Sequence, residues 1–142
     1  MDINVVDDAL SWVVSHPERF FTSGKPTELE LLRSVWMDAV LCGATEVATV
    51  RKHGHWIVGA SADWLGQTDI APSELFTRLV PLPQAGPNSV RSEILLRAFC
   101  SEVGAVSKGR FLTIKGGKEV EGLLTQFFSE HQTLRGAVAF QL

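Results

Sequence analysis

The sequence has little cysteine, and its cysteines form no metal-binding or redox pattern. Its 142 residues contain two, Cys42 and Cys100, each within an apolar stretch of predicted helix. There is no Cys-x-x-Cys pair, and the spacing of the two residues matches no metal site built on cysteine. We therefore expect two reduced thiols in the core, which is typical of a cytoplasmic protein.

Long apolar runs and clusters of basic residues are also missing. No stretch approaches the roughly 20 apolar residues that span a bilayer. The N-terminal MDINVVDDAL carries acids where a signal peptide carries lysines. The net charge is -3, and no basic stripe follows the chain. These absences argue against a membrane partner and against a nucleic-acid partner, and they favour a cytoplasmic location.

The overall composition is that of an ordinary globular domain. Hydrophobic residues make up 45% of the chain and charged residues 20%, which is too apolar for a disordered protein. No linker, low-complexity segment or internal repeat divides the chain, so residues 1–142 are expected to form one domain. Within this domain, residues 1–24 form an N-terminal helical extension and residues 27–142 form the core.

The spacing of apolar residues predicts two helices in the first third of the chain. The first runs from residue 4 to about residue 15, because Pro17 prevents its continuation. Thr27 and Glu30 form a capping box that starts the second helix, and Gly43 ends it. The apolar residues of the second helix are expected to face the core; they are Leu29, Leu32, Val35, Trp36, Ala39 and Val40.

The rest of the chain alternates between predicted strands and helices. Residues 45–52 and 55–62 are expected to form an antiparallel hairpin around the turn His53-Gly54. The later elements are a short helix (72–79), a helix capped by Asn88 or Ser89, a strand (109–117), a helix (118–131) and a closing strand (136–142). This order predicts an α/β (α+β) fold, a two-layer sandwich in which helices cover one face of a mixed sheet of about four or more strands.

Residues 31–66, LLRSVWMDAVLCGATEVATVRKHGHWIVGASADWLG, contain three short motifs in a known order. A helix carries Asp38-Ala39, a strand follows Gly43-Ala44-Thr45, and the next strand ends at Asp63. The segment resembles the core of the GHKL ATPase superfamily, which includes gyrase B, MutL, the heat-shock chaperone ATPase and the catalytic domains of histidine kinases. The resemblance covers residues 27–142, because AGPNSVRSEILLRAFCSEV and RFLTIKG resemble the family's second glycine box and the elements after it.

The resemblance implies a nucleotide site. Asp63 matches the aspartate that accepts the adenine amino group, and Asp38 matches the position that binds Mg²⁺, an ion that prefers hard oxygen ligands. A helix start beside Arg91 offers N–H groups and a positive charge to an anion. The candidate nucleotide-binding residues are therefore Asp38, Asp63, Gly66, Gly86, Asn88, Ser89 and Arg91, with Asp38 as the candidate metal ligand.

The chain departs from the family pattern at the positions that bind and hydrolyse ATP. Ser34 stands where the family carries its general base, and its hydroxyl cannot act as a base at neutral pH. Leu65 replaces a glycine after the adenine-binding aspartate, and with Trp64 it fills the space of the base. Only Gly86 remains of the second glycine box. We therefore expect no catalytic residues, and we interpret Asp63 as a residue that holds a turn.

The remaining motifs carry no recognisable chemistry. His53 and His55 flank the hairpin turn, where two histidines two residues apart can share a metal ion. No cysteine or acid close in sequence completes a ligand set, so both histidines are interpreted as exposed polar residues of the hairpin. The segment 115–119, KGGKE, lacks the glycine and the hydroxyl residue that a phosphate-binding loop requires. No Gly-x-Ser-x-Gly motif occurs.

An aromatic cluster at the N-terminus suggests a contact surface. By spacing, Trp12 lies opposite the apolar face of the first helix, and Phe20 and Phe21 follow it closely. We therefore expect a non-enzymatic regulatory or protein-interaction module without a cofactor, whose partner is another protein or a second copy of the chain. Two alternatives stay open. One is an adenine-nucleotide-binding protein or weak ATPase that uses Asp63 and Asp38 with ATP or ADP and Mg²⁺, and the other is a sensor of a small anion or metabolite.

Overall fold

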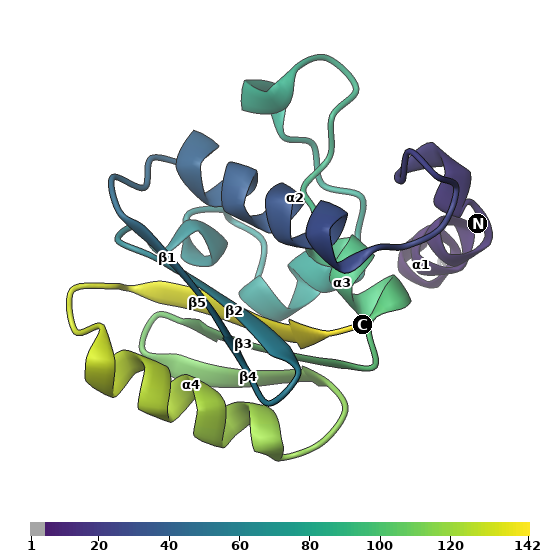
Figure 1. Cartoon of the computed structure of the whole chain (residues 1–142). Coiled ribbons are helices and arrows are strands. Elements are labelled where there is room, and N and C mark those ends of the chain that lie inside the picture. The colour runs from purple at the N-terminus through teal and green to yellow at the C-terminus, as the bar shows by residue number, and fades with distance from the viewer. Residues whose placement is uncertain (1–4) are drawn as a thin grey trace.

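The computed structural model describes residues 5–142 and has an α+β architecture (Figure 1). Its helices are α1 (Val5–Ser15), α2 (Glu28–Leu41), α3 (Glu93–Phe99) and α4 (Glu119–Glu130). Its strands are β1 (Val47–Lys52), β2 (His55–Ala60), β3 (Glu102–Ser107), β4 (Arg110–Lys115) and β5 (Gly136–Gln141). Within the described residues, no helix has both the length and the apolar character needed to cross a membrane. The predicted α+β class is confirmed.

The strands form one antiparallel sheet in the order β1-β2-β5-β3-β4. The turn between β1 and β2 consists of His53 (φ 53°) and Gly54 (φ 79°), and the turn between β3 and β4 has the same conformation. Two-residue turns of this kind match the natural twist of paired strands. The hairpin around His53-Gly54 is therefore confirmed. The predicted mixed sheet is wrong, because β5 runs antiparallel to both of its neighbours, β2 and β3.

The sequence prediction fails most clearly between residues 88 and 107. Asn88 has a φ of 66° and Val90 forms an isolated bridge with Pro81, so neither residue belongs to a helix. The helix starts at Glu93 after Ser92, which corrects the predicted cap at Asn88 or Ser89. It is followed by β3, a strand that was not predicted. Because β3 is covered on both faces, its residues lack the apolar–polar alternation that identifies a strand with one solvated face.

The sheet separates two clusters of buried apolar residues. Val58 of β2 and Val138 of β5 face α2 and α3, whereas their neighbours Ile57 and Ala139 face α4. Figure 1 shows α4 on one side of the sheet and α2 and α3 on the other. The prediction that helices cover one face is therefore incomplete. The apolar runs of β2 and β5 explain why α4 covers the other face of the sheet, since a run of consecutive apolar residues in a strand is buried on both faces.

The first turn of α2 confirms the predicted capping box. The Glu30 N–H donates to Thr27 Oγ1 at 3.3 Å, and the Thr27 hydroxyl donates to Glu30 Oε1 at 3.1 Å. The other carboxylate oxygen, Oε2, accepts from the backbone N–H and the hydroxyl of Thr22. These contacts join the preceding loop to the helix and determine where α2 begins.

Candidate functional site

A cleft lies along α2, between this helix and the segment from Gln84 to Val90. It has a volume of about 600 Å³, which is within the usual range for small-molecule sites. In Figure 1 the segment that carries the short turn Pro83–Ala85 projects beyond α2. The polar residues that line the cleft are Arg19, Glu30, Arg33, Ser34, Asp38, Gln84, Asn88, Ser89 and Ser92.

The cleft brings together some of the residues predicted from the family resemblance and leaves others out. Asp38 on α2 and Asn88 and Ser89 on the facing loop line it together, although about fifty positions separate them in sequence. Gly86 belongs to the same loop but does not line the cleft. Asp63, Gly66 and Arg91 also lie outside the lining.

Asp38 lies at the buried side of this cleft and is bound to the start of α3. Its side chain is 6% exposed, and its Oδ2 accepts hydrogen bonds from the backbone N–H and the hydroxyl of Ser92, both at 2.7 Å. Burial raises the pKa of Asp38 to about 6, and the negative charge of Glu93 adds to this, while the Ser92 hydrogen bonds and Arg91 oppose it. A carboxyl group that titrates near neutrality in a cleft is typical of a functional site, although buried networks also produce such shifts.

Arg91 lies beneath Asp38 in a buried ion pair. Its Nε donates to Glu93 Oε1 at 3.0 Å, and its Nη2 donates to Glu93 Oε2 at 2.9 Å and to the Trp64 carbonyl at 3.1 Å. Arg91 is 4% exposed and Glu93 is 1% exposed. Burial disfavours the guanidinium charge, but the Glu93 carboxylate outweighs it and raises the pKa of Arg91. Arg91 was predicted to bind an anion at a helix start; its guanidinium is instead held in the core.

Glu93 was not singled out in the sequence. The signal that could have identified it is a charged pair, Arg91 and Glu93, two residues apart at the start of an apolar helix. A charged residue in such a position is buried only when it has a partner. The charge of Asp38 interacts with those of Glu93 and Arg91, although Arg91 forms its ion pair with Glu93. This group of three therefore carries an excess of negative charge whenever both carboxylates are ionised.

The two cysteines are free thiols, as predicted. Cys100 is buried, and burial raises its pKa to about 12. Cys42 is half-buried beside Arg91, and burial raises its pKa as well. Both side chains are therefore protonated at neutral pH, where a thiol is a poor nucleophile.

The structure places Asp63 in a turn where its carboxylate is used by the protein itself. The Ser107 hydroxyl donates to this carboxylate at 2.9 Å, and the Lys108 N–H donates to Oδ2 at 2.8 Å. Gly66 packs against the same carboxylate, since a Cβ at this position would lie 2.6 Å from Oδ2. These contacts connect the end of β2 to the β3–β4 turn. The carboxylate makes no capping hydrogen bond in its own turn, so Asp63 holds a turn that is distant in sequence rather than the local turn that the sequence suggested.

Trp64 and Leu65 follow Asp63 in a short turn and are fully buried. Both belong to the core cluster between the sheet, α2 and α3. Their side chains therefore occupy interior space beside Asp63, as the sequence suggested. The carbonyl of Trp64 also accepts a hydrogen bond from Arg91, which joins this turn to the network below the cleft.

The N-terminal aromatic residues form only part of the predicted surface. Trp12 is exposed, stacks on His16 with ring centroids 4.5 Å apart, and meets Phe20 edge to face at 6.0 Å. Phe21 is buried and packs against Phe99 at 5.3 Å. Phe21 is therefore a core residue that joins the extension to α3, and its assignment to a contact surface is wrong.

The hairpin histidines do not act as a pair. His53 is exposed in the turn, as expected, but His55 is 1% exposed. The prediction that both are exposed polar residues is thus wrong for His55. Its Nε2 lies 2.7 Å from Oε1 of Glu102, a partner 47 positions away that local spacing did not indicate.

Comparison with known proteins adds no family to this description. No protein-family model, curated protein or solved structure matches the chain.

Proposed function

We propose that this chain is a non-enzymatic protein-interaction module and that its contact surface is the outer face of α2. The observation that carries this proposal is a stripe of four large apolar side chains that the fold leaves in solvent. Their exposed fractions are 69% for Leu29, 41% for Trp36, 37% for Met37 and 37% for Val40. We call these four residues the α2 stripe.

The helical repeat explains why these residues gather on one side of α2. Leu29, Trp36 and Val40 are seven and four positions apart, so they lie within a narrow sector of the helix. The core-facing residues Leu31, Val35 and Ala39 occupy the opposite side. The sequence prediction that Leu29, Trp36 and Val40 face the core is therefore wrong, because α2 carries apolar residues on two faces and only one of them meets the sheet.

Contact between water and an apolar stripe of this kind is unfavourable, and a partner that covers the stripe removes this contact. Contiguous apolar surface on a monomer marks an interaction site, and tryptophan and methionine are enriched in the centre of protein interfaces. The stripe spans eleven residue steps, which is about 17 Å of helix. The polar groups beneath the neighbouring cleft are held by internal contacts, as described for Asp38, Arg91 and Glu93, and this supports binding rather than catalysis.

A second copy of this chain is the partner we infer. An apolar stripe along a helix is complementary to itself about a two-fold axis, because each apolar side chain then meets another one. Arg33 is exposed and lies among the stripe residues, four positions from Leu29 and from Met37. In a two-fold pair its long side chain has to extend past the apolar contact so that its charge stays in solvent. The GHKL-like scaffold implied by the sequence would serve here as a frame for α2.

Replacing Trp36 with glutamate is expected to prevent this association. Sedimentation velocity of the wild-type chain between about 1 and 200 µM should show a monomer–dimer equilibrium, and the variant should raise the dissociation constant by about 30-fold, as loss of a central interface residue does. Trp12→Glu places the same charge on the α1 surface and is expected to leave the equilibrium unchanged. A wild-type monomer across this range, or an equal effect of Trp12→Glu, would overturn the proposal.

A ligand in the cleft is the second candidate function, and the gathering of Asp38, Asn88 and Ser89 around one cavity favours it. Among the side chains that the structure describes, Arg33 on the α2 wall has no carboxylate within 4.0 Å. A guanidinium in that position suits the phosphates of an adenine nucleotide or another small anion.

Thermal unfolding with millimolar ATP or ADP and Mg²⁺ tests the second candidate. A nucleotide present at about 100 times its dissociation constant stabilises the folded state by roughly 2.7 kcal/mol. We expect such a shift to disappear in Arg33→Gln and to persist in Arg110→Gln, which removes an exposed arginine of β4 that does not line the cleft. The absence of any shift with the wild-type chain would contradict nucleotide binding.

A further inference from the structure

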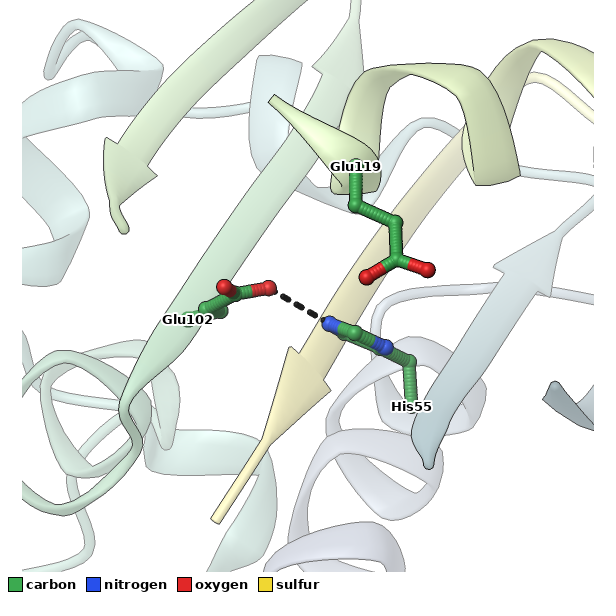
Figure 2. A group of neighbouring side chains, drawn as sticks. All are labelled: His55, Glu102 and Glu119. Carbon is green, nitrogen blue, oxygen red and sulfur yellow. Dashed lines mark hydrogen bonds and ion pairs between the residues drawn. The ribbon is translucent and has the colours of Figure 1, made fainter. Parts of the chain in front are cut away.

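One end of the sheet carries a cluster of metal-ligating side chains away from the α2 cleft. His55 begins β2, Glu102 begins β3 and Glu119 begins α4, and one potential ligand atom from each lies within 4.8 Å of the others. Figure 2 shows the three side chains pointing toward one another, with one ring nitrogen of His55 facing Glu102 and the Glu119 carboxylate beside the imidazole. The strands β2 and β3 lie on either side of β5, so this cluster joins three elements that are distant in sequence.

The surroundings of His55 require a cation at its Nε2. The other ring nitrogen, Nδ1, lies 3.0 Å from the backbone carbonyl oxygen of His53. Because a carbonyl oxygen has no proton, Nδ1 must carry the hydrogen of this contact. Nε2 of a neutral imidazole then holds a lone pair, yet it lies 2.7 Å from Oε1 of Glu102. Two lone pairs repel at this distance, so a proton lies between them at this separation. A metal ion that took the place of the proton would need the two atoms about 3.3 Å apart.

The charges of the three side chains favour a divalent ion over a proton. A proton on Nε2 gives one positive imidazolium beside two carboxylates and leaves one negative charge without compensation inside the cluster. A divalent ion balances both carboxylates and keeps the imidazole neutral, which is the form that binds metals. His55 is 1% exposed, Glu102 is half-buried and Glu119 is exposed, so the cluster is anchored in the protein and open to solvent on one side.

We propose that Nε2 of His55 and the carboxylates of Glu102 and Glu119 bind one divalent transition-metal ion, for which Zn²⁺ is the best fit. Zn²⁺ accepts imidazole nitrogen together with carboxylate oxygen, and three protein ligands leave a fourth position for water. Mg²⁺ prefers oxygen ligands alone. The His53 carbonyl bound to Nδ1 is the outer contact that orients a metal-binding imidazole.

The loop before α4 is built to hold Glu119 near the other two ligands. Gly116 lies against Glu102, and a Cβ at this position would be 2.6 Å from Glu102 Cγ and 2.9 Å from the Ser101 carbonyl oxygen. Its φ of 91° also disfavours any other residue. Ligand atoms around tetrahedral Zn²⁺ are about 3.3 Å apart, so the Glu102 carboxylate has to move back by about half an ångström and Glu119 has to move inward. The ion would then join β2, β3 and α4.

Calorimetric titration of the full chain with Zn²⁺ alone tests this site. We expect one Zn²⁺ to bind per chain and to raise the thermal midpoint, whereas Mg²⁺ at the same concentration should do neither. Glu119→Gln should raise the dissociation constant at least about tenfold, as loss of metal-site residues does. This variant changes an exposed side chain and keeps the His55–Glu102 contact, so it is expected to fold.

Two matched variants separate this site from adventitious zinc binding. Glu121→Gln removes an exposed carboxylate from the same turn of α4, and His53→Gln removes the exposed imidazole of the hairpin while keeping its carbonyl. Both should bind Zn²⁺ as the wild-type chain does. The proposal is overturned if the wild-type chain binds no stoichiometric Zn²⁺, if Glu119→Gln binds with unchanged affinity, or if His53→Gln abolishes binding. The first outcome leaves His55 and Glu102 as an ion pair only, and the other two place the zinc on a different set of ligands.

Discussion

Replacing Arg91 with methionine is expected to lower the free energy of unfolding by about 3–5 kcal/mol, the usual loss when one partner of a buried ion pair is removed. The variant leaves the carboxylate of Glu93 buried without its bidentate partner, in the neighbourhood of Asp38. The Trp64 carbonyl also loses its donor. Urea denaturation at neutral pH, monitored by tryptophan fluorescence, measures the change. A loss of this size is a large part of the stability of a typical domain.

The double variant Arg91→Met/Glu93→Met is the control for this prediction. It removes both charges and replaces them with apolar side chains of similar length, so it should recover most of the lost stability. If the double variant is as unstable as Arg91→Met alone, the loss comes from packing rather than from an uncompensated charge. Glu93→Gln keeps an acceptor for the guanidinium, and its smaller expected loss gives a measurement if Arg91→Met does not fold.

Asp38 is expected to make the stability of the protein fall as the pH rises from about 4 to about 7. Its pKa is raised from 3.8 to about 6 in the folded state, so the folded chain holds this proton more tightly than the unfolded chain does. The resulting stabilisation is fully present below the unfolded pKa and is lost as the pH passes through the folded pKa. Two pKa units correspond to a change on the order of 3 kcal/mol.

Asp38→Asn should remove this dependence. Asparagine keeps a side-chain oxygen that can accept both hydrogen bonds from Ser92 but has no charge to bury. The measurement is the difference in unfolding free energy between wild type and variant at several pH values. Asp69→Asn, at an exposed position, is the matched control and should leave the profile unchanged. Identical pH profiles for Asp38→Asn and wild type would show that Asp38 ionises in the fold as it does in water.

Features that depend on neighbouring residues were predicted well from the sequence. The capping box at Thr27 and Glu30 and the hairpin at His53-Gly54 are chemical preferences of a few consecutive residues, and both are present in the structure. The α+β class follows from the spacing of apolar residues in the same way. β3 was missed because this local signal fails for a strand that is covered on both faces.

The candidate sites depend on contacts between residues that are distant in sequence. Asp38 was singled out, but its partner Ser92 lies 54 positions away, and His55 meets Glu102 across 47 positions. Neither the periodicity of apolar residues nor a short motif can indicate contacts between residues so far apart in the sequence. Glu102 and Glu119 were therefore not singled out in the sequence, and His55 was interpreted as an exposed residue of the hairpin.

The sequence by itself determined where α2 begins and where the β1–β2 hairpin turns, because these features are governed by neighbouring residues and the side chains that cap them. Only the tertiary structure decided which apolar face of α2 is buried, since that depends on where the sheet lies. It also decided that Arg91 is buried in a charged pair, because the low dielectric of the core makes this position tolerable only beside Glu93. In the same way it brought His55, Glu102 and Glu119 together by placing β5 between the two hairpins.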